Sequence, residues 1–163
     1  MPAKDFDSVT ALRDAGLRVT APRLAVLDVL RSSSHVDAET ITRDVRAKLG
    51  SVSTQAIYDV LHALNSAEIV RRIDPSGAAA ARYELHRHDN HHHLVCRGCE
   101  AIVDVACDEG HAPCLSPQET SGFAIDEAEI IFWGLCPSCF DVRNGEHIGD
   151  IRGTQVSTRR KYE

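Results

Sequence analysis

Four of the six cysteines form two closely spaced pairs. Cys96 and Cys99 make one C-x2-C motif, and Cys136 and Cys139 make a second. Each motif places two thiolates on one tight turn, and two such turns brought together form the tetrahedral four-sulfur site that zinc favours. A redox-active pair and four unreactive buried thiols are the alternatives, but no βαβ unit of the thioredoxin type is visible. The pattern therefore favours structural zinc that joins two distant segments.

A run of histidines lies near the middle of the chain. Alternate residues of an extended segment face the same side, so His91 and His93 can bind one ion while His92 points away. Mixed nitrogen and oxygen ligands suit Fe(II), Mn(II) or Zn(II). The candidate ligands are His35, Glu84, His91, His93 and Asp104. An ion held by all of them would fix the angle between two domains, whereas a solvated polar linker would bind metal weakly.

Charge is distributed unevenly along the 163 residues, whose net charge is −6. Residues 1–88 carry 12 basic and 11 acidic side chains, whereas residues 89–145 carry 2 basic and 10 acidic ones. The acidity of the whole chain alone argues against binding to nucleic acid, but it belongs to the second part. We expect two domains, residues 1–87 and 88–145, followed by a polar tail, residues 146–163, that is disordered.

The sequence has no pattern typical of a membrane span or an export signal. No apolar run approaches the roughly 18 residues that a transmembrane helix needs, and the first residues have no apolar signal region. Six cysteines without an export signal favour metal or redox chemistry in a reducing compartment. We expect a cytoplasmic protein without a membrane partner.

The first domain has the pattern of helices followed by a β-hairpin. The expected helices are residues 6–15 and three that begin after the capping residues Thr20, Asp37 and Ser53. Two extended runs, residues 69–73 and 82–85, flank a Pro/Gly turn. This order predicts a winged helix-turn-helix, and the alternative is a small α+β domain that does not bind nucleic acid.

The sequence pattern of the second domain predicts strands around the cysteine motifs. Residues 101–105 and 123–133 are rich in Ile, Val and aromatic residues, which favours strands. A short helix is expected at residues 115–120. After Cys139 the composition turns polar, and we expect disorder from there on.

Five segments together resemble the ferric uptake regulator (Fur) family of repressors. They are GLRVTAPR at 16–23, STQAIY at 53–58, RYE at 82–84, HHHLVCRGC at 91–99 and GLCPSC at 134–139. The resemblance covers roughly residues 5–142. It implies an α+β protein with an N-terminal winged helix-turn-helix and a small α/β dimerisation domain. It also implies a metal-loaded homodimer that binds palindromic double-stranded operator DNA and represses transcription.

The resemblance assigns roles to matching positions. Cys96, Cys99, Cys136 and Cys139 would hold structural Zn(II). His35, Glu84, His91, His93 and Asp104 would hold the regulatory ion, Fe(II) or Mn(II), with Zn(II) as the alternative. A recognition helix beginning near Ser53 would enter the major groove. The expected DNA contacts are Arg18, Arg23, Thr54, Gln55 and Tyr58.

Two features resemble the actinobacterial FurA-type subgroup, which is linked to catalase-peroxidase expression. They are residues 55–64 and the pair Cys107 and Cys114. This likeness implies release from DNA by peroxide oxidation at the regulatory metal and control of oxidative-stress genes. A sensor of iron or zinc availability is an alternative, and so is a thiol switch through Cys107 and Cys114. These two thiols can equally be unreactive.

Three positions depart from patterns within the family. Asp59 stands where many members have an arginine after the recognition-helix tyrosine, and a carboxylate cannot pair with phosphate. Ala128 replaces a histidine that serves a third metal site in some members. Glu84 is the residue typical of iron sensors, whereas one type of peroxide sensor has an aspartate there.

The sequence contains none of the enzyme motifs that would fit its metal ligands. There is no H-E-x-x-H and no nucleophile elbow, and a four-cysteine zinc site leaves no open position for water. We therefore expect no enzymatic activity and no small organic substrate. A metal store would need no winged helix.

Overall fold

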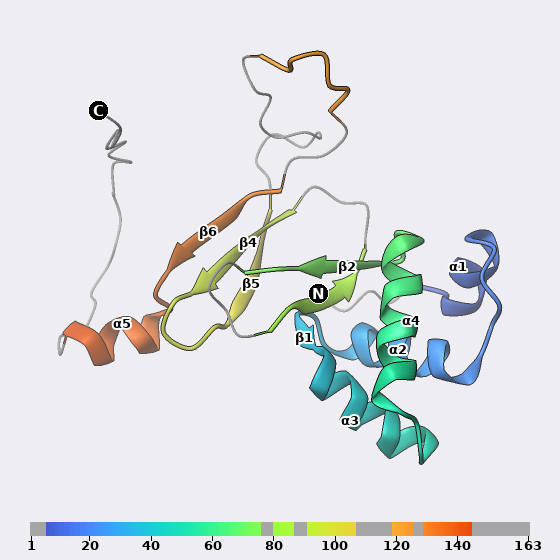
Figure 1. The fold of residues 1–163 in the computed structure, drawn as a ribbon. Helices are drawn as coiled ribbons and strands as arrows, with labels where there is room; N and C mark the ends of the chain where they lie inside the picture. The colour runs from blue at the N-terminus through green and yellow to red at the C-terminus, as the bar shows by residue number, and fades with distance from the viewer. Residues whose placement is uncertain (1–5, 76–79, 87–90, 107–118, 126–128, 145–163) are drawn as a thin grey trace.

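The computed structural model describes residues 6–75, 80–86, 91–106, 119–125 and 129–144. In chain order the helices are α1 (Ser8–Asp14), α2 (Ala21–Ser32), α3 (Ala38–Leu49), α4 (Thr54–Ser66) and α5 (Pro137–Asn144). The strands are β1 (Val36–Asp37), β2 (Val70–Ile73), β3 (Arg82–Leu85), β4 (His91–Cys96), β5 (Ile102–Ala106) and β6 (Ile131–Gly134). Figure 1 shows α1 to α4 at one end and α5 at the other, with the strands between them.

The helices of the first part begin where side chains cap them. Asp37 and Ser53 occupy N-caps as predicted, and they accept from the backbone N–H groups of Thr40 and Ala56. Thr20 also stands at an N-cap, but its side chain makes no capping hydrogen bond, and α2 begins with a proline in its first turn. The first helix begins at Ser8 rather than Phe6, because the carboxylate of Asp7 caps it.

A hydrophobic core and a three-stranded antiparallel sheet complete a winged helix-turn-helix. The core side chains with almost no exposed surface include Leu12, Leu27, Leu30, Ile41, Ile57, Leu61 and Leu64. The sheet has the order β1-β3-β2, and β2 and β3 are the expected hairpin. The sequence did not indicate β1, which pairs Val36 with Tyr83 and places the preceding residue, His35, beside β3.

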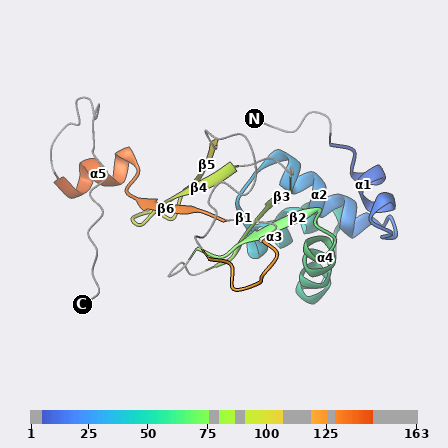
Figure 2. The same ribbon diagram turned by 90° about the horizontal axis from the view of Figure 1, so that it is seen from above.

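The second sheet has the order β5-β4-β6, with β4 antiparallel to β5 and parallel to β6. The expected strand over residues 123–133 is corrected: residues 123–125 and 129–130 lie outside strands, and only Ile131–Gly134 pairs with β4. The expected disorder after Cys139 is also corrected, because α5 continues to Asn144. Figure 2 shows α5 beyond β6, on the side away from the helices of the winged domain.

Several expectations fall on residues outside the described ranges. They are most of the helix expected at 115–120, the pair Cys107 and Cys114, Ala128, and the tail from residue 146. Among the described residues, none of the helices has the length and apolar composition needed to cross a bilayer.

Candidate metal centres and nucleic-acid interface

The four cysteines of the two C-x2-C motifs meet at one end of the second sheet. Cys96 ends β4, and Cys136 lies two residues after the end of β6. Because β4 and β6 are parallel neighbours, both motifs lie at the same edge, and the four sulfurs all lie within 4.8 Å of one another. Four thiol sulfurs at this separation form the donor set that zinc prefers in closed structural sites.

The thiols of this cluster have opposed pKa shifts. Backbone N–H groups of Cys136, Cys99 and Gly98 stabilise the Cys96 thiolate and lower its pKa to about 6. The sulfurs of Cys136, Cys99 and Cys96 raise the pKa of Cys139 to about 12. Neighbouring sulfurs thus oppose the accumulation of negative charge, which a divalent cation would neutralise. The residues therefore fit Zn(II).

Gly98 allows the two motifs to approach each other. A Cβ atom at this position would lie 2.9 Å from both Cβ and Sγ of Cys139. Such separations are shorter than van der Waals contact. Any larger residue would push the first turn away from the cysteine of α5.

A second cluster joins the winged domain to the second sheet. His35 comes from the turn before β1 and Glu84 from β3, whereas β4 and β5 supply His93 and Asp104, which are register partners. The four residues each offer a ligand atom within 4.8 Å of the others. His35 Nε2 lies 2.8 Å from Asp104 Oδ1 and 3.1 Å from Glu84 Oε2. His93 Nε2 lies 3.4 Å from Glu84 Oε1.

His91 lies beside this cluster rather than within it. Its Nε2 is 3.1 Å from Glu84 Oε1, and its ring meets that of His93 edge to face with centroids 5.0 Å apart. Burial raises the pKa of Glu84, but the adjacent imidazoles of His35, His91 and His93 favour the charged carboxylate, outweigh this effect and hold the pKa well below its usual range. His92 points to the opposite face, where its ring packs against Phe132 with centroids 6.3 Å apart.

The second cluster fits a divalent cation. His35 Nε2 and both ring nitrogens of His93 are buried and make no hydrogen bond of favourable geometry, although carboxylate oxygens lie close by. Buried polar atoms normally have hydrogen-bond partners. Imidazole nitrogens and carboxylate oxygens that converge in this way are typical ligands of Fe(II), Mn(II) or Zn(II).

Helix α4 presents the expected recognition residues on its outer side. Thr54, Gln55 and Tyr58 are exposed, Tyr58 to 48%. Arg46 of α3, which the sequence analysis did not single out, donates to Val52 O at 2.8 Å and to Thr54 Oγ1 at 3.0 Å. It therefore fixes the turn between α3 and α4. Its position six residues before Val52, across a Gly/Ser turn, was the only sequence signal.

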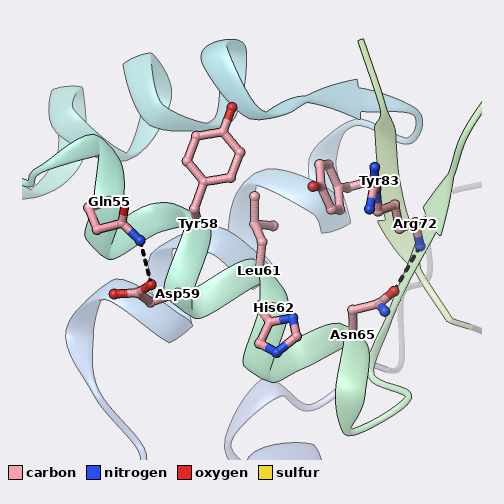
Figure 3. Close-up of a pocket in the computed structure, with 8 residues that line it drawn as sticks. All are labelled: Gln55, Tyr58, Asp59, Leu61, His62, Asn65, Arg72 and Tyr83. Carbon is pink, nitrogen blue, oxygen red and sulfur yellow. Dashed lines mark hydrogen bonds between the residues drawn. The ribbon is translucent and has the colours of Figure 1, made fainter.

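A groove of about 320 Å³ lies between α4 and the hairpin, and Figure 3 shows its lining. Tyr58, Asp59, His62 and Asn65 come from α4, and Arg72 and Tyr83 come from the strands. Asn65 Oδ1 accepts from the backbone N–H of Arg72 at 3.0 Å, which ties the hairpin to α4. The other expected contacts, Arg18 and Arg23, lie before and within α2, where Arg23 Nη1 donates to the carbonyl of Arg18 at 2.7 Å.

Comparison with known proteins agrees with the fold. The ferric uptake regulator family model matches residues 14–133. The transcriptional regulator FurA of Mycobacterium tuberculosis is 56% identical over 133 residues, 82% of this chain and 90% of that protein. Ferric uptake regulation protein 2 of Mycolicibacterium fortuitum is 57% identical over 137 residues, 83% of this chain and 92% of that protein.

Two proteins with lower sequence identity also resemble this chain. The peroxide-responsive repressor PerR of Staphylococcus saprophyticus is 31% identical over 141 residues, 83% of this chain and 90% of that protein. The crystal structure of the Vibrio cholerae ferric uptake regulator superposes with a TM-score of 0.62 at 28% identity, over 80% of this chain and 100% of that one.

The winged helix and the two ligand clusters define a metal-responsive DNA-binding protein. The chain belongs to the ferric uptake regulator family. It is a transcriptional regulator and not an enzyme.

Proposed function

We propose that this protein is a homodimeric repressor whose binding to operator DNA requires a cation at the second cluster. The observation that carries the proposal is the origin of the ligands. His35 and Glu84 come from the winged domain, and His93 and Asp104 come from the second sheet. The regulatory ion is Fe(II) or Mn(II), with His91 as a further ligand, while Cys96, Cys99, Cys136 and Cys139 hold structural Zn(II).

The ligands act by restraining one domain against the other. A cation supplies the positive charge that makes the convergence of two carboxylates and several imidazoles favourable. His35 and Glu84 then keep the winged domain in one orientation relative to β4 and β5. The arrangement in which both domains contribute ligands is stabilised only to the extent that it binds the ion more tightly than an arrangement with the domains apart.

An apolar face of the second sheet supports the dimer. Leu94 is the register partner of both Val103 and Phe132, and these side chains are 42%, 58% and 48% exposed. Contiguous exposed apolar side chains mark interaction surfaces. A second copy packed there by two-fold symmetry would present two α4 helices to a palindromic operator.

DNA recognition would use the exposed part of α4 and the arginines near α2. Tyr58 would contact a thymine methyl group, Gln55 would read an adenine edge, and Thr54 would bind the backbone. Arg18 and Arg23 would bind phosphate. Because residues 1–88 carry a net charge of only +1, two copies are needed to attract the DNA strongly.

Peroxide is the signal that we propose to end repression, at genes for oxidative-stress defence such as catalase-peroxidase. The support is the likeness to FurA and to the peroxide-responsive repressor, together with histidines that would lie next to a redox-active ion. Fe(II) bound there would supply the reducing chemistry toward peroxide. Oxygen addition to a ligand histidine would then remove a ligand and free the winged domain.

A sensor of iron availability is the second candidate. The 57% identity to a ferric uptake regulation protein favours it, as does a glutamate at position 84. A thiol switch at Cys107 and Cys114 is a third reading, and serine at both positions with the peroxide response retained would dismiss it.

Two measurements test the proposal. Full-length protein should be retained on duplexes with inverted repeats when Mn(II) or Fe(II) is present and should be lost when the cation is removed. Retention that does not depend on metal would contradict the requirement for a cation at the second cluster. Peroxide treatment of the Fe(II) form should add oxygen to His35, His91 or His93 by mass spectrometry; release of DNA by iron removal alone would instead favour the iron sensor.

A further inference from the structure

Asp59 accepts a hydrogen bond from Gln55, the side chain of α4 that we propose reads a base. Gln55 Nε2 donates to Asp59 Oδ1 at 2.8 Å, one helical turn away. Both side chains are exposed on the outer side of α4 and line the groove beside the hairpin. Figure 3 shows the two side by side, with the bond between them.

This bond restricts the orientation of the Gln55 carboxamide. A carboxylate only accepts hydrogen bonds, whereas a carboxamide has one accepting oxygen and two N–H donors. The amide nitrogen of Gln55 therefore faces Asp59, and its Oε1 faces away. A flipped carboxamide would place its oxygen against the carboxylate and lose the bond. One N–H group and Oε1 remain available for DNA.

The remaining groups match one purine better than the other. Adenine presents an N6 amine donor and an N7 acceptor in the major groove, and guanine presents two acceptors, N7 and O6. Gln55 Oε1 can accept from adenine N6 while the remaining N–H donates to N7.

We propose that Asp59 is a positioning residue that holds Gln55 in the orientation selecting adenine over guanine at one operator position. The inference rests on the proposed contact between Gln55 and DNA. This role accounts for a carboxylate on the side of α4 that would face DNA, where it cannot bind phosphate. Asp59 sets sequence preference and contributes no affinity of its own.

The test selects DNA from a pool of duplexes with randomised bases, using full-length Mn(II)-loaded protein, followed by affinity measurements. The position read by Gln55 is the one whose preference disappears in Gln55→Ala. At that position the wild type should prefer adenine over guanine by roughly tenfold or more. Asp59→Asn should reduce the preference to roughly twofold or less, because an asparagine amide accepts either orientation of Gln55.

Two further variants separate positioning from charge. Glu39→Gln removes an exposed carboxylate from α3 and should leave the preference intact. The double variant Gln55→Ala, Asp59→Asn should match Gln55→Ala alone, because Asp59 acts only through Gln55. A base preference in the double variant that differs from that of Gln55→Ala, at this or any other operator position, would overturn this role.

The outcomes also distinguish this inference from the function beneath it. Full adenine preference in Asp59→Asn overturns the inference and leaves the Gln55 contact standing. Unchanged preference at every position in Gln55→Ala overturns both. A wild type that selects no sequence, with or without Mn(II), overturns the proposed function.

Discussion

His35 Nε2 and Asp104 Oδ1 lie 2.8 Å apart, although one residue comes from the winged domain and the other from the second sheet. His35 reaches this position with a φ of 57°, in the left-handed region that non-glycine residues seldom adopt. Strained backbone of this kind persists where the surrounding structure enforces it, often at functional sites. The pair therefore joins the two domains at the point where a cation held by the second cluster would act.

Removing Asp104 should weaken the second cluster without affecting the first. We expect Asp104→Ala to lower Mn(II) affinity by at least about tenfold, because a carboxylate ligand is lost. Zinc bound by the four cysteines should remain. Calorimetric titration with Mn(II) and metal analysis measure the two effects. Asp141→Ala, which removes an exposed carboxylate from α5, is the matched control; equal Mn(II) affinity in both variants would disprove the assignment.

Gly98 should be required for tight zinc binding. Gly98→Ala places a methyl group 2.9 Å from Cys139 Sγ and Cβ, and the resulting overpacking should cost about 1–3 kcal/mol. Zinc should leave this variant faster in competition with a chelator, and the thermal midpoint should fall. Gly134→Ala is the control, since its Cβ would meet no atom within 4 Å. Similar zinc loss in the two variants would be inconsistent with the close approach.

Asp37 should stabilise the winged domain in a pH-dependent way. The backbone N–H of Thr40 lowers the pKa of Asp37 from 3.8; burial opposes this, and Arg82, whose Nη1 lies 2.8 Å away, adds to the lowering. Asp37→Ala should reduce the free energy of unfolding by about 1–2 kcal/mol through loss of the cap. Asp37→Asn should cost less, because asparagine also caps helices.

The sign of the pH dependence follows from the lowered pKa. The Asp37 carboxylate stabilises the fold fully above its unfolded-state pKa near 3.8, and this contribution is lost as the pH falls through the folded-state value. Denaturant unfolding of the wild type and Asp37→Asn should show a constant difference between about pH 7 and about pH 5. The difference should shrink below about pH 4. A difference that grows on acidification would rule out this explanation.

Arg46 should support DNA binding from within the protein. Arg46→Ala frees Val52 O and Thr54 Oγ1, and loosening the turn before α4 should lower DNA affinity by roughly fivefold to tenfold. The slope of affinity against salt should stay unchanged, whereas Arg18→Ala should reduce it by about 1. Arg43→Ala, which removes an exposed arginine of the same helix, is the control. A reduced salt slope in Arg46→Ala would instead indicate a phosphate contact.

Sequence patterns predicted the elements that depend on local chemistry. Asp37 and Ser53 cap helices because their side chains reach backbone N–H groups within the same turn. The cysteine pairs predicted a four-sulfur cluster because metal-ligand spacing is local to each motif. The alternation of His91, His92 and His93 in β4 likewise followed from strand geometry.

Two of the misses, helix α5 and residues 123–125, depended on long-range contacts. Helix α5 is polar, so its composition did not indicate a helix. It begins at Pro137, between two cysteines of the cluster, and its position depends on contact with the other cysteine motif. Residues 123–125 have apolar side chains, but only Ile131–Gly134 lies along β4. The bond between Gln55 and Asp59 was visible as an i, i+4 spacing, and only the structure showed that it forms.

The coupling between metal binding and DNA binding is the decisive property of the proposed repressor. Affinity for a fluorescent inverted-repeat duplex should be measured with and without Mn(II), and Mn(II) affinity with and without that duplex. Both affinities should rise by the same factor, as linkage requires, and His35→Ala should abolish the coupling while zinc stays bound. Equal DNA affinity with and without Mn(II), or full coupling in His35→Ala, would contradict the requirement for a cation at the second cluster.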